Sequence, residues 1–395
     1  MPAIGSRATL GLLGAVAAAA RAVAVARTPD YAPHHDDHSY MMHALALVHD
    51  HAYPVFHAGA HPVATAYRAP GFPLMLASAD RVFGASVATE RAAQVVAGAA
   101  VAVMAWWVAR EIWGARTALA AGLLVALSPV LVLFNASLIS EQLFTALLLG
   151  ALACALHARG RLRWAVAAGV LAGAAALTRP EGLALALGVA LCAGGRRAAA
   201  AVLAATVLCV APWTVRNALV LHAFVPVSTE TGNTLAGTYN VRSLADSRWR
   251  DPRLSHLYPA ARAAHRRNEA ATDHALEHEV LRFVAAHPTA PLRVAVANAG
   301  RLAGVAPTGF SRLSLTSVSL PTGPAPVLRI ALLITTLLGL AGAATTAARR
   351  APPGWWLTFG LVAVVALLVN AEQRFAVPLQ PFLLLLAPLP FTRGR

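Results

Sequence analysis

Long apolar segments alternate with short polar connections along most of the chain. A helix needs about 20 predominantly apolar residues to cross a bilayer. Ten segments approach this pattern, and we expect each to form a transmembrane helix: residues 8–26, 88–108, 117–134, 141–157, 164–178, 182–194, 198–215, 326–347, 355–370 and 377–391. The predicted fold class is an all-α polytopic membrane protein.

The distribution of arginine predicts how these helices are oriented. Every second connection between the predicted helices is rich in arginine, as is the end of the sequence. These arginines are Arg110, Arg116, Arg159, Arg161, Arg163, Arg196, Arg197, Arg349, Arg350, Arg393 and Arg395. The short connections between them contain only Arg179 and Arg374 as basic residues. Because cytoplasmic loops carry the excess of positive charge, we expect cytoplasmic termini and a multi-pass protein of the plasma (inner) membrane. The two long polar segments, 27–87 and 216–325, then lie together on the outer side.

The first apolar segment has a second interpretation. Its uninterrupted apolar run ends at Arg21, and a run of that length is also typical of a cleavable signal peptide. We favour a retained helix, because a polytopic protein needs no cleavage. With either interpretation the connection that follows lies outside.

The outer segments are predicted to contain short helices of their own. Residues 38–50 place apolar side chains at helical spacing, and residues 71–83 form a second short apolar stretch with Pro73 in its first turn. Both are too short to span and are expected to lie in the interface. In the second outer segment, residues 259–287 predict a helical cap, and residues 292–306 are apolar enough to dip into the membrane.

We therefore divide the chain into three parts. Residues 1–220 form an N-terminal membrane catalytic module that includes the first outer loop, 27–87. Residues 221–325 form an outer region that faces the acceptor, and residues 326–395 form the C-terminal transmembrane helices.

Composition supports the membrane prediction and excludes a nucleic-acid-binding protein. Hydrophobic residues make up 58% of the chain and charged residues 12%, against about 25% charged residues in soluble domains. The net charge is +15, but the sequence contains no lysine and its arginines are spread over many short loops. This spread fits membrane orientation better than a phosphate-backbone surface. The three cysteines, each within an apolar run, predict neither a disulfide framework nor a metal site.

Ionisable residues gather at one level, the outer ends of the predicted helices. Acidic residues are scarce, yet five of them lie there: Asp36, Asp37, Glu141, Glu181 and Glu372. Four arginines lie at the same level: Arg68, Arg179, Arg216 and Arg374. Charges near the membrane are costly unless they are paired or used, so we expect a charged, partly buried pocket at the outer interface.

The order of these motifs resembles that of GT-C glycosyltransferases, the superfamily that includes protein O-mannosyltransferases and lipid A aminoarabinose transferases. The shared motifs are DDHSY at 36–40, YRAPGFPLMLA at 67–77, SLISEQLF at 137–144, TRPEGLALA at 178–186, APWTVRN at 211–217 and RFAVPLQP at 374–381. The resemblance covers most of the chain except the 230–325 region. It implies a GT-C type bundle with interfacial helices in the first outer loop and a small outer helical segment.

The resemblance also implies a reaction and roles for the site residues. An acid of the first loop, Asp36 or Asp37, acts as the general base, with Asp30 as a further candidate. The donor is a polyprenyl-phosphate-linked sugar in contact with membrane lipid, and the acceptor is a hydroxyl of an unknown glycan, lipid or protein. The transfer inverts the anomeric centre. The substrate-binding residues implied, with Arg68 first as the phosphate contact, are Arg68, Tyr40, Glu141, Arg179, Glu181, Arg216 and Arg374.

Other interpretations of the same residues remain open. Either acid of the first loop can cap the helix that follows, Arg68 can anchor the interface, and Arg179 can pair with Glu181. The run HHDDH at 34–38 suggests a divalent metal, but it straddles a helix start in a His-rich loop, so we expect no required cofactor. A transporter or lipid flippase is the alternative function, and a non-catalytic scaffold is a third. Charges at one interface and nearly bare helix interiors favour an enzyme.

Overall fold

A computed structural model describes residues 4–50, 53, 55–58, 61–246, 248–252, 268–369 and 372–392, and these are almost entirely helical. The helices of the bundle are α1 (Ile4–Ala26), α4 (Val87–Trp113), α5 (Ala115–Leu127), α6 (Pro129–Phe134), α7 (Glu141–Ala158), α8 (Leu162–Ala176), α9 (Gly182–Cys192), α10 (Arg196–Leu221), α17 (Ala325–Ala343), α18 (Pro353–Leu368) and α19 (Gln380–Leu386). Nine of the ten predicted spans fall on apolar helices of ten or more residues, whereas 377–391 coincides only with the seven-residue α19. The predicted all-α polytopic fold is confirmed.

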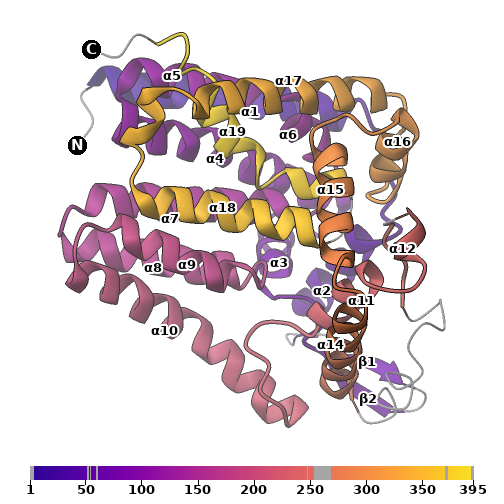
Figure 1. Ribbon diagram of the computed structural model, residues 1–395. Helices are drawn as coiled ribbons and strands as arrows, with labels where there is room; N and C mark the ends of the chain where they lie inside the picture. Colours follow the sequence, from indigo (N-terminus) through magenta and orange to yellow (C-terminus); the bar gives the residue numbers. More distant parts are fainter. Residues whose placement is uncertain are drawn as a thin grey trace.

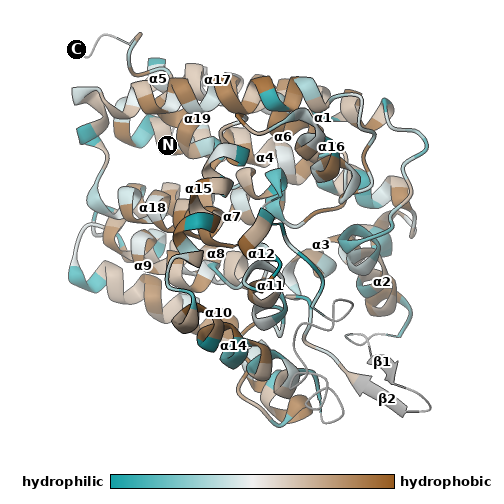
Figure 2. Ribbon diagram, turned by 45° about the vertical axis from the view of Figure 1, so that its right-hand side comes forward, coloured by the Kyte–Doolittle hydropathy of each residue, from teal (hydrophilic) through white to brown (hydrophobic). Residues whose placement is uncertain are grey.

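Five of these helices are long and apolar enough to cross a membrane unaided: α1, from Arg7, together with α4, α7, α10 and α17. The shorter apolar helices are α5, α8, α9 and α18. The predicted span 117–134 is divided into α5 and α6 at Ser128, because Pro129 has no N–H to donate and restricts the preceding residue to an extended conformation. Figure 2 shows that apolar residues dominate the bundle helices, so the chain is an integral membrane protein.

Small residues let the bundle helices approach closely. Added Cβ atoms would lie 2.3 Å from the Val202 carbonyl oxygen at Gly169 and 2.5 Å from the Cys209 Cβ at Gly173, so this GxxxG face of α8 packs directly against α10. On the other side of the bundle, Gly188 of α9 and Gly354 of α18 face each other at similar range. These contacts fix the relative heights of the helices and hence of the loops at their ends.

The two long polar segments lie at the same end of the bundle, opposite the end that holds the termini (Figure 1). The first contains α2 (Asp36–His49), α3 (Gly71–Phe83) and an antiparallel hairpin of β1 (Val55–Ala58) and β2 (His61–Ala64). The predicted short helices at 38–50 and 71–83 match α2 and α3 closely. The hairpin was not predicted.

The second polar segment forms a layer of short helices across that end. Its elements are α11 (Thr231–Thr238), α12 (Ser243–Asp246), α14 (Glu269–Ala286), α15 (Ala290–Leu302) and α16 (Thr308–Thr316). Part of the predicted helix 259–287 lies outside the described residues, and α14 covers the remainder. The apolar stretch at 292–306 lies largely in α15, which runs crosswise to α17 and α18 and so does not cross the bundle (Figure 1).

This layer holds the last turns of the chain in place. Two 3₁₀ helices flank α18: η1 (Thr346–Arg350) and η2 (Gln373–Ala376). The Gln373 backbone N–H donates to Ser314 Oγ at 3.0 Å, and its side-chain amide donates to the Arg301 carbonyl at 2.9 Å. Because Arg374 follows directly, α15 and α16 position it.

Candidate active site

The two acids of the first loop have different surroundings. Asp37 is fully buried, and its Oδ2 accepts a hydrogen bond of 2.8 Å from the Tyr31 hydroxyl. Its Oδ1 accepts three backbone N–H groups, those of His34, His35 and His38. A carboxylate that accepts so many bonds at a helix start fixes the local backbone. The side chain of Asp37 is thus engaged in holding the N-terminus of α2.

Asp36 turns the other way, toward two arginines from distant parts of the sequence. Its Oδ1 accepts from Arg68 Nη2, and its Oδ2 accepts from Arg374 Nη2 at 2.6 Å. The Asp36 side chain is 31% exposed, whereas those of Arg68 and Arg374 are 4% and 10% exposed. Asp36 is therefore a partly exposed carboxylate held between two buried guanidinium groups.

Each arginine also contacts a second acid. Glu230 Oε1 lies 2.5 Å from Arg68 Nη1, and Glu372 Oε2 lies 2.9 Å from Arg374 Nε. The result is an alternating chain of charges, Glu230–Arg68–Asp36–Arg374–Glu372, which we call the ion-pair chain. Its members come from all three parts of the predicted domain division, so folding is required to assemble it.

Burial and the neighbouring charges shift the pKa values of Asp36 and Glu230, two of the three acids in the ion-pair chain, in opposite directions. Burial alone would raise the pKa of Asp36, but the guanidinium groups of Arg68 and Arg374 outweigh burial and hold this pKa well below its usual range. For Glu230, burial raises the pKa, and Arg68 offsets this only in part. Asp36 is consequently ionised at any physiological pH.

A second cluster lies beside the ion-pair chain and is centred on Arg179. Arg179 Nη1 lies 2.9 Å from Glu141 Oε1, and Arg179 Nε donates to Glu181 Oε1 at 2.6 Å. Nη1 also donates to Ser140 Oγ at 3.2 Å. The expected pairing with Glu181 is present, but Glu141 shares the arginine. We call these four residues the Arg179 cluster.

Two aromatic residues connect the Arg179 cluster to the ion-pair chain. The Tyr40 hydroxyl donates to Ser140 Oγ at 3.2 Å, and Arg68 lies 4.8 Å from the centre of the Tyr40 ring. Arg179 and Arg374 lie 5.3 Å and 5.1 Å from the centre of the Phe375 ring. Cation–π contacts of this kind stabilise arginines that are withdrawn from water. The two sets of charges thus form one continuous site.

The strand-like segment that carries Arg68 is fixed by a network on its far side. Glu269, the first residue of α14, accepts from the Thr65 hydroxyl at 2.7 Å and also from the Ala66 backbone N–H. The Thr229 backbone N–H donates to the Ala66 carbonyl at 3.1 Å. These bonds align the residues before Arg68 with those before Glu230, so both side chains reach the same place.

Arg216 serves this network and does not join the ion-pair chain. Its Nη1 donates to the Thr65 carbonyl at 2.7 Å, and its guanidinium stacks 4.8 Å from the centre of the Trp213 ring. Arg216 therefore positions the loop that carries Arg68. Asp30, the further candidate for the base, is exposed.

Neither the HHDDH run nor any other part of the described chain gathers three or more His, Cys, Asp or Glu side chains in an arrangement that could hold a metal ion. In that run, the backbone N–H groups of His34 and His35 contact Asp37 instead.

Sequence reasoning missed Glu230. It lies 162 residues from Arg68 in the sequence and within the 230–325 region, where the family resemblance fails. The scarcity of acids was the available signal, because Glu230 is one of only 17 Asp and Glu residues in the chain.

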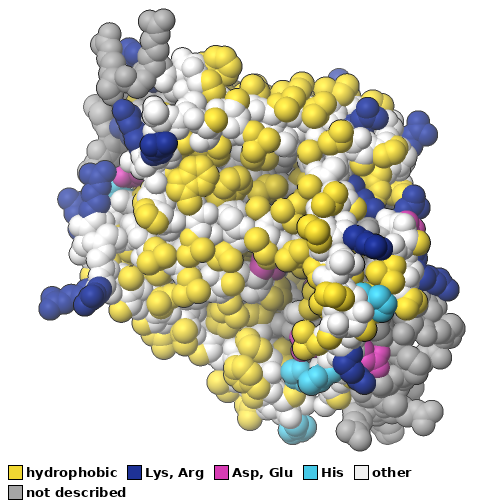
Figure 3. Space-filling model, in the orientation of Figure 1, with side chains coloured by type: hydrophobic (Ala, Val, Ile, Leu, Met, Phe, Trp, Pro, Cys, Tyr) yellow, Lys and Arg dark blue, Asp and Glu magenta, His cyan; other side chains and the backbone are white. Residues whose placement is uncertain are grey.

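Arg179 and Glu181 also line a small, largely apolar pocket. The rest of its lining consists of apolar side chains of α7, α9, α18 and the η2 region: Phe144, Leu185, Val362, Val365, Ala366, Phe375 and Pro378. Figure 3 shows acidic side chains at the margin of a hollow in the largely apolar face, between α18 above and α10 and α14 below.

Comparisons with known proteins agree with this architecture. Residues 62–229, less than half of the chain, match the protein family described as Dolichyl-phosphate-mannose-protein mannosyltransferase. Among solved structures, the oligosaccharyltransferase AglB of Archaeoglobus fulgidus is similar over 97% of this chain and 50% of its own, with 14% identity and a TM-score of 0.57. Its apo form gives 15% identity, coverage of 96% and 50%, and a TM-score of 0.56.

ArnT from Cupriavidus metallidurans gives 17% identity, coverage of 97% of this chain and 78% of its own, and a TM-score of 0.49. No curated protein matches the sequence.

The chain has the GT-C fold of membrane glycosyltransferases, which confirms the resemblance inferred from the motifs. The family match and this fold together support a GT-C glycosyltransferase. The chain spans about half the length of the AglB structures that it matches.

Proposed function

We propose that the protein transfers a sugar from a polyprenyl-phosphate donor to an acceptor hydroxyl at the outer face of the membrane, with inversion and with Asp36 as the general base. The observation that carries this proposal is the position of Asp36 between Arg68 and Arg374, at the end of the bundle that holds the long polar segments (Figure 1). The arginine-rich loops at the opposite end support the outer location.

The arginines of the site suit a phosphate leaving group. A guanidinium presents several N–H donors in a plane and binds phosphate oxygens in pairs. Arg68 and Arg374 bring two such groups to one carboxylate, and Arg179 lies beside them in contact with the same Phe375 ring as Arg374. Preorganised positive charge at a developing anion is often the largest catalytic contribution. We assign the donor phosphate to these arginines, with the lipid chain against the apolar residues that line the pocket beside Arg179.

The reaction is a single displacement. Asp36 removes the proton from the acceptor hydroxyl while that oxygen forms a bond to the anomeric carbon. The bond from the anomeric carbon to the phosphate oxygen breaks, and its electron pair leaves with the polyprenyl phosphate. Attack from the side opposite the leaving group inverts the anomeric centre.

Asp36 is a weak base while two guanidinium ions hold it. A donor phosphate that takes over part of the Arg68 and Arg374 donors weakens both ion pairs and thereby raises the pKa of Asp36 toward its ordinary value. Binding of the donor thus releases the carboxylate that deprotonates the acceptor hydroxyl. The burial of Asp37 and its four accepted hydrogen bonds favour Asp36 over Asp37 for this role.

The AglB structure was solved with a dolichol-phosphate and an inhibitory peptide, so a protein with this fold binds both a lipid phosphate and a peptide. By analogy we retain the predicted division, with 1–220 as the catalytic module, 221–325 facing the acceptor and 326–395 as the C-terminal helices, and we add that Arg374 of this last part contacts the donor phosphate.

The proposal is tested with the full chain in nanodiscs and a panel of radiolabelled polyprenyl-phosphate sugars that begins with the mannose donor. We expect the label to leave the lipid-extractable fraction in the presence of a mixed cell-envelope acceptor fraction. Label that stays on intact lipid, and only changes leaflet when the protein is placed in vesicles, would identify a flippase instead.

A further inference from the structure

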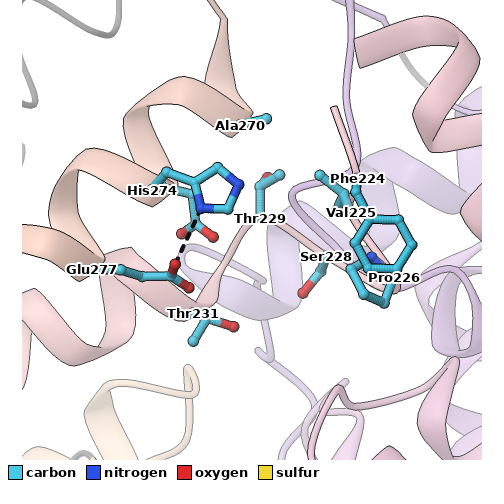
Figure 4. A pocket seen from close by; sticks show the side chains of 10 residues that line it. Phe224, Val225, Pro226, Ser228, Thr229, Thr231, Ala270, His274 and Glu277 are labelled. Carbon is cyan, nitrogen blue, oxygen red and sulfur yellow. Dashed lines mark hydrogen bonds and ion pairs between the residues drawn. The ribbon is translucent and has the colours of Figure 1, made fainter. Parts of the chain in front are cut away.

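A cavity of about 110 Å³ lies between α14 and the segment 224–231, outside the ion-pair chain (Figure 4). Acids and hydroxyl groups line much of it, namely Asp273 and Glu277 of α14 together with Ser228, Thr229 and Thr231. Within the part of the chain that the structure describes, no arginine lines it. The cavity therefore has an acidic lining in a chain whose formal net charge is +15.

One polar group in the cavity wall is buried without a partner. Ser228 is only 9% exposed, and its hydroxyl oxygen makes no hydrogen bond within the described chain. In Figure 4 this oxygen points toward Thr231 and α14. A buried hydroxyl that lacks a partner is costly, so the group is suited to a bound ligand.

The other lining groups indicate what such a ligand offers. Glu277 is 34% exposed and contacts His274 Nδ1 at 3.3 Å, so the carboxylate stands at the cavity mouth and accepts hydrogen bonds. The hydroxyls of Ser228 and Thr231 both donate and accept. Phe224 is 73% exposed at the rim and presents an apolar ring surface. Several hydroxyl partners around an apolar face match a neutral sugar, and the acids repel an anionic one.

The cavity is separated from the reaction centre by a single segment of chain. Thr229 and Thr231 line the cavity, while Glu230 between them contacts Arg68 of the ion-pair chain. Asp36 is not among the lining residues, so the hydroxyl that reacts does not lie in this cavity.

We propose that the cavity is an acceptor subsite that holds a neutral sugar residue next to the one that reacts, with Glu277 and Ser228 as its hydrogen-bonding groups. This inference rests on the proposed function, because it makes the acceptor a glycan of at least two sugars. It also places the specificity for the acceptor in the 221–325 region, apart from the arginines that hold the donor.

The first experiment measures binding without catalysis. Saturation-transfer NMR on the full chain in nanodiscs uses methyl α-mannopyranoside, with sodium glucuronate and a threonine-containing peptide as comparison probes. We expect signal transfer to the mannoside and loss of this signal in Glu277→Gln. The matched control is Glu279→Gln, which makes the same charge change on α14 outside the cavity lining, and it should keep the signal.

The second experiment separates acceptor from donor. With an oligosaccharide acceptor, Glu277→Gln should raise the acceptor KM about tenfold and Ser228→Ala by about threefold, with a much smaller change in the donor KM, because each removes hydrogen bonds to the acceptor alone. An acceptor KM equal to that of the unmodified protein in both variants would overturn the subsite, as would preferential binding of the peptide or glucuronate. If the unmodified protein transferred no sugar at all, the proposed function would fail, and the NMR result would still decide whether the cavity binds a sugar.

Discussion

The two ends of the helical bundle place arginine in different environments. At the end that holds the termini, the loop arginines are exposed: Arg159, Arg161, Arg163, Arg196, Arg197, Arg349 and Arg350. Arg159 is 76% exposed there and lies 3.7 Å from Glu111, whereas at the opposite end Arg68 is 4% exposed and contacts two carboxylates. Exposed ion pairs contribute little to stability, while buried charges are costly and require partners.

On the proposed function, this difference separates charges that orient the protein in the membrane from charges that take part in the reaction. The exposed arginines need only their positive charge and remain solvated. The buried arginines need specific geometry, because the loss of one partner leaves another charge unpaired. Changes of the same chemical type should consequently have unequal effects at the two ends.

The largest effect is expected for Asp36→Asn, which keeps the side-chain shape but removes the base. The rate of sugar transfer should fall by about a thousandfold or more, within the usual range of general-base contributions combined with altered charge. Radiolabel transfer by purified protein in nanodiscs measures this. Elution and thermal unfolding should show that the variant remains folded.

Asp37→Asn is the matched comparison at the neighbouring position. It weakens the four hydrogen bonds at the start of α2 and should lower the free energy of unfolding by about 1–3 kcal/mol. The folded fraction should keep transfer activity to within about tenfold. If Asp37→Asn abolished transfer while Asp36→Asn kept it, the base would be Asp37.

The next effect concerns the phosphate contacts. Arg374→Lys keeps one charge but loses the planar fork, so kcat/KM for the donor should fall about 10- to 100-fold. Arg159→Lys at the exposed end should change kcat/KM by less than about twofold. Donor saturation curves measure kcat/KM for both variants. Equal losses of kcat/KM would contradict the different roles assigned to arginines at the two ends of the bundle.

A smaller effect is expected at Glu111, which lies close to the exposed Arg159 at the end of the bundle that holds the termini. Glu111 Oε1 lies 2.9 Å from His157 Nδ1 and accepts from Trp107 Nε1 at 3.3 Å. Glu111→Gln should lower the free energy of unfolding by about 1 kcal/mol or less and leave transfer unchanged. Thermal unfolding together with the transfer assay measures both quantities.

The smallest effect is a shift in pH dependence at the α14 cavity. Burial, and secondarily the charge of Glu277, raise the pKa of Asp273 to about 7. The acceptor KM should therefore change between about pH 6 and 8 as Asp273 ionises, with His274 as the other titratable neighbour. Because Glu277 helps to raise this pKa, Glu277→Gln should move the midpoint to lower pH. A midpoint that does not move would mean that Asp273 does not cause the dependence.

Most of the fold was predictable because the length of an apolar segment indicates whether it forms a helix in a membrane. The predicted helix 71–83 coincides with α3, and the spans differ from the observed helices mainly at their ends. The β1–β2 hairpin was missed because each strand has only four residues, too few for a clear alternation, in a loop that otherwise looked polar and His-rich.

For the site, the sequence predicted only that a set of charged residues lies together at the outer ends of the helices. Motif order brought forward Asp36, Arg68 and Arg374, and the structure brings these three into contact. Sequence could not divide the roles of Asp36 and Asp37, since adjacent residues point to different sides of a helix start. It also could not find Glu230, because that contact depends on how Glu269 aligns two loops that are far apart in the sequence.

The most direct measurement is a structure of the full chain in nanodiscs with a non-cleavable polyprenyl-phosphonate sugar analogue. We expect the phosphonate oxygens within hydrogen-bonding distance of Arg68 and Arg374, the lipid chain along α9 and α18, and the Asp36 carboxylate turned toward the anomeric carbon. A phosphonate bound away from both arginines, with Asp36 still held between them, would contradict the role of this carboxylate as the base.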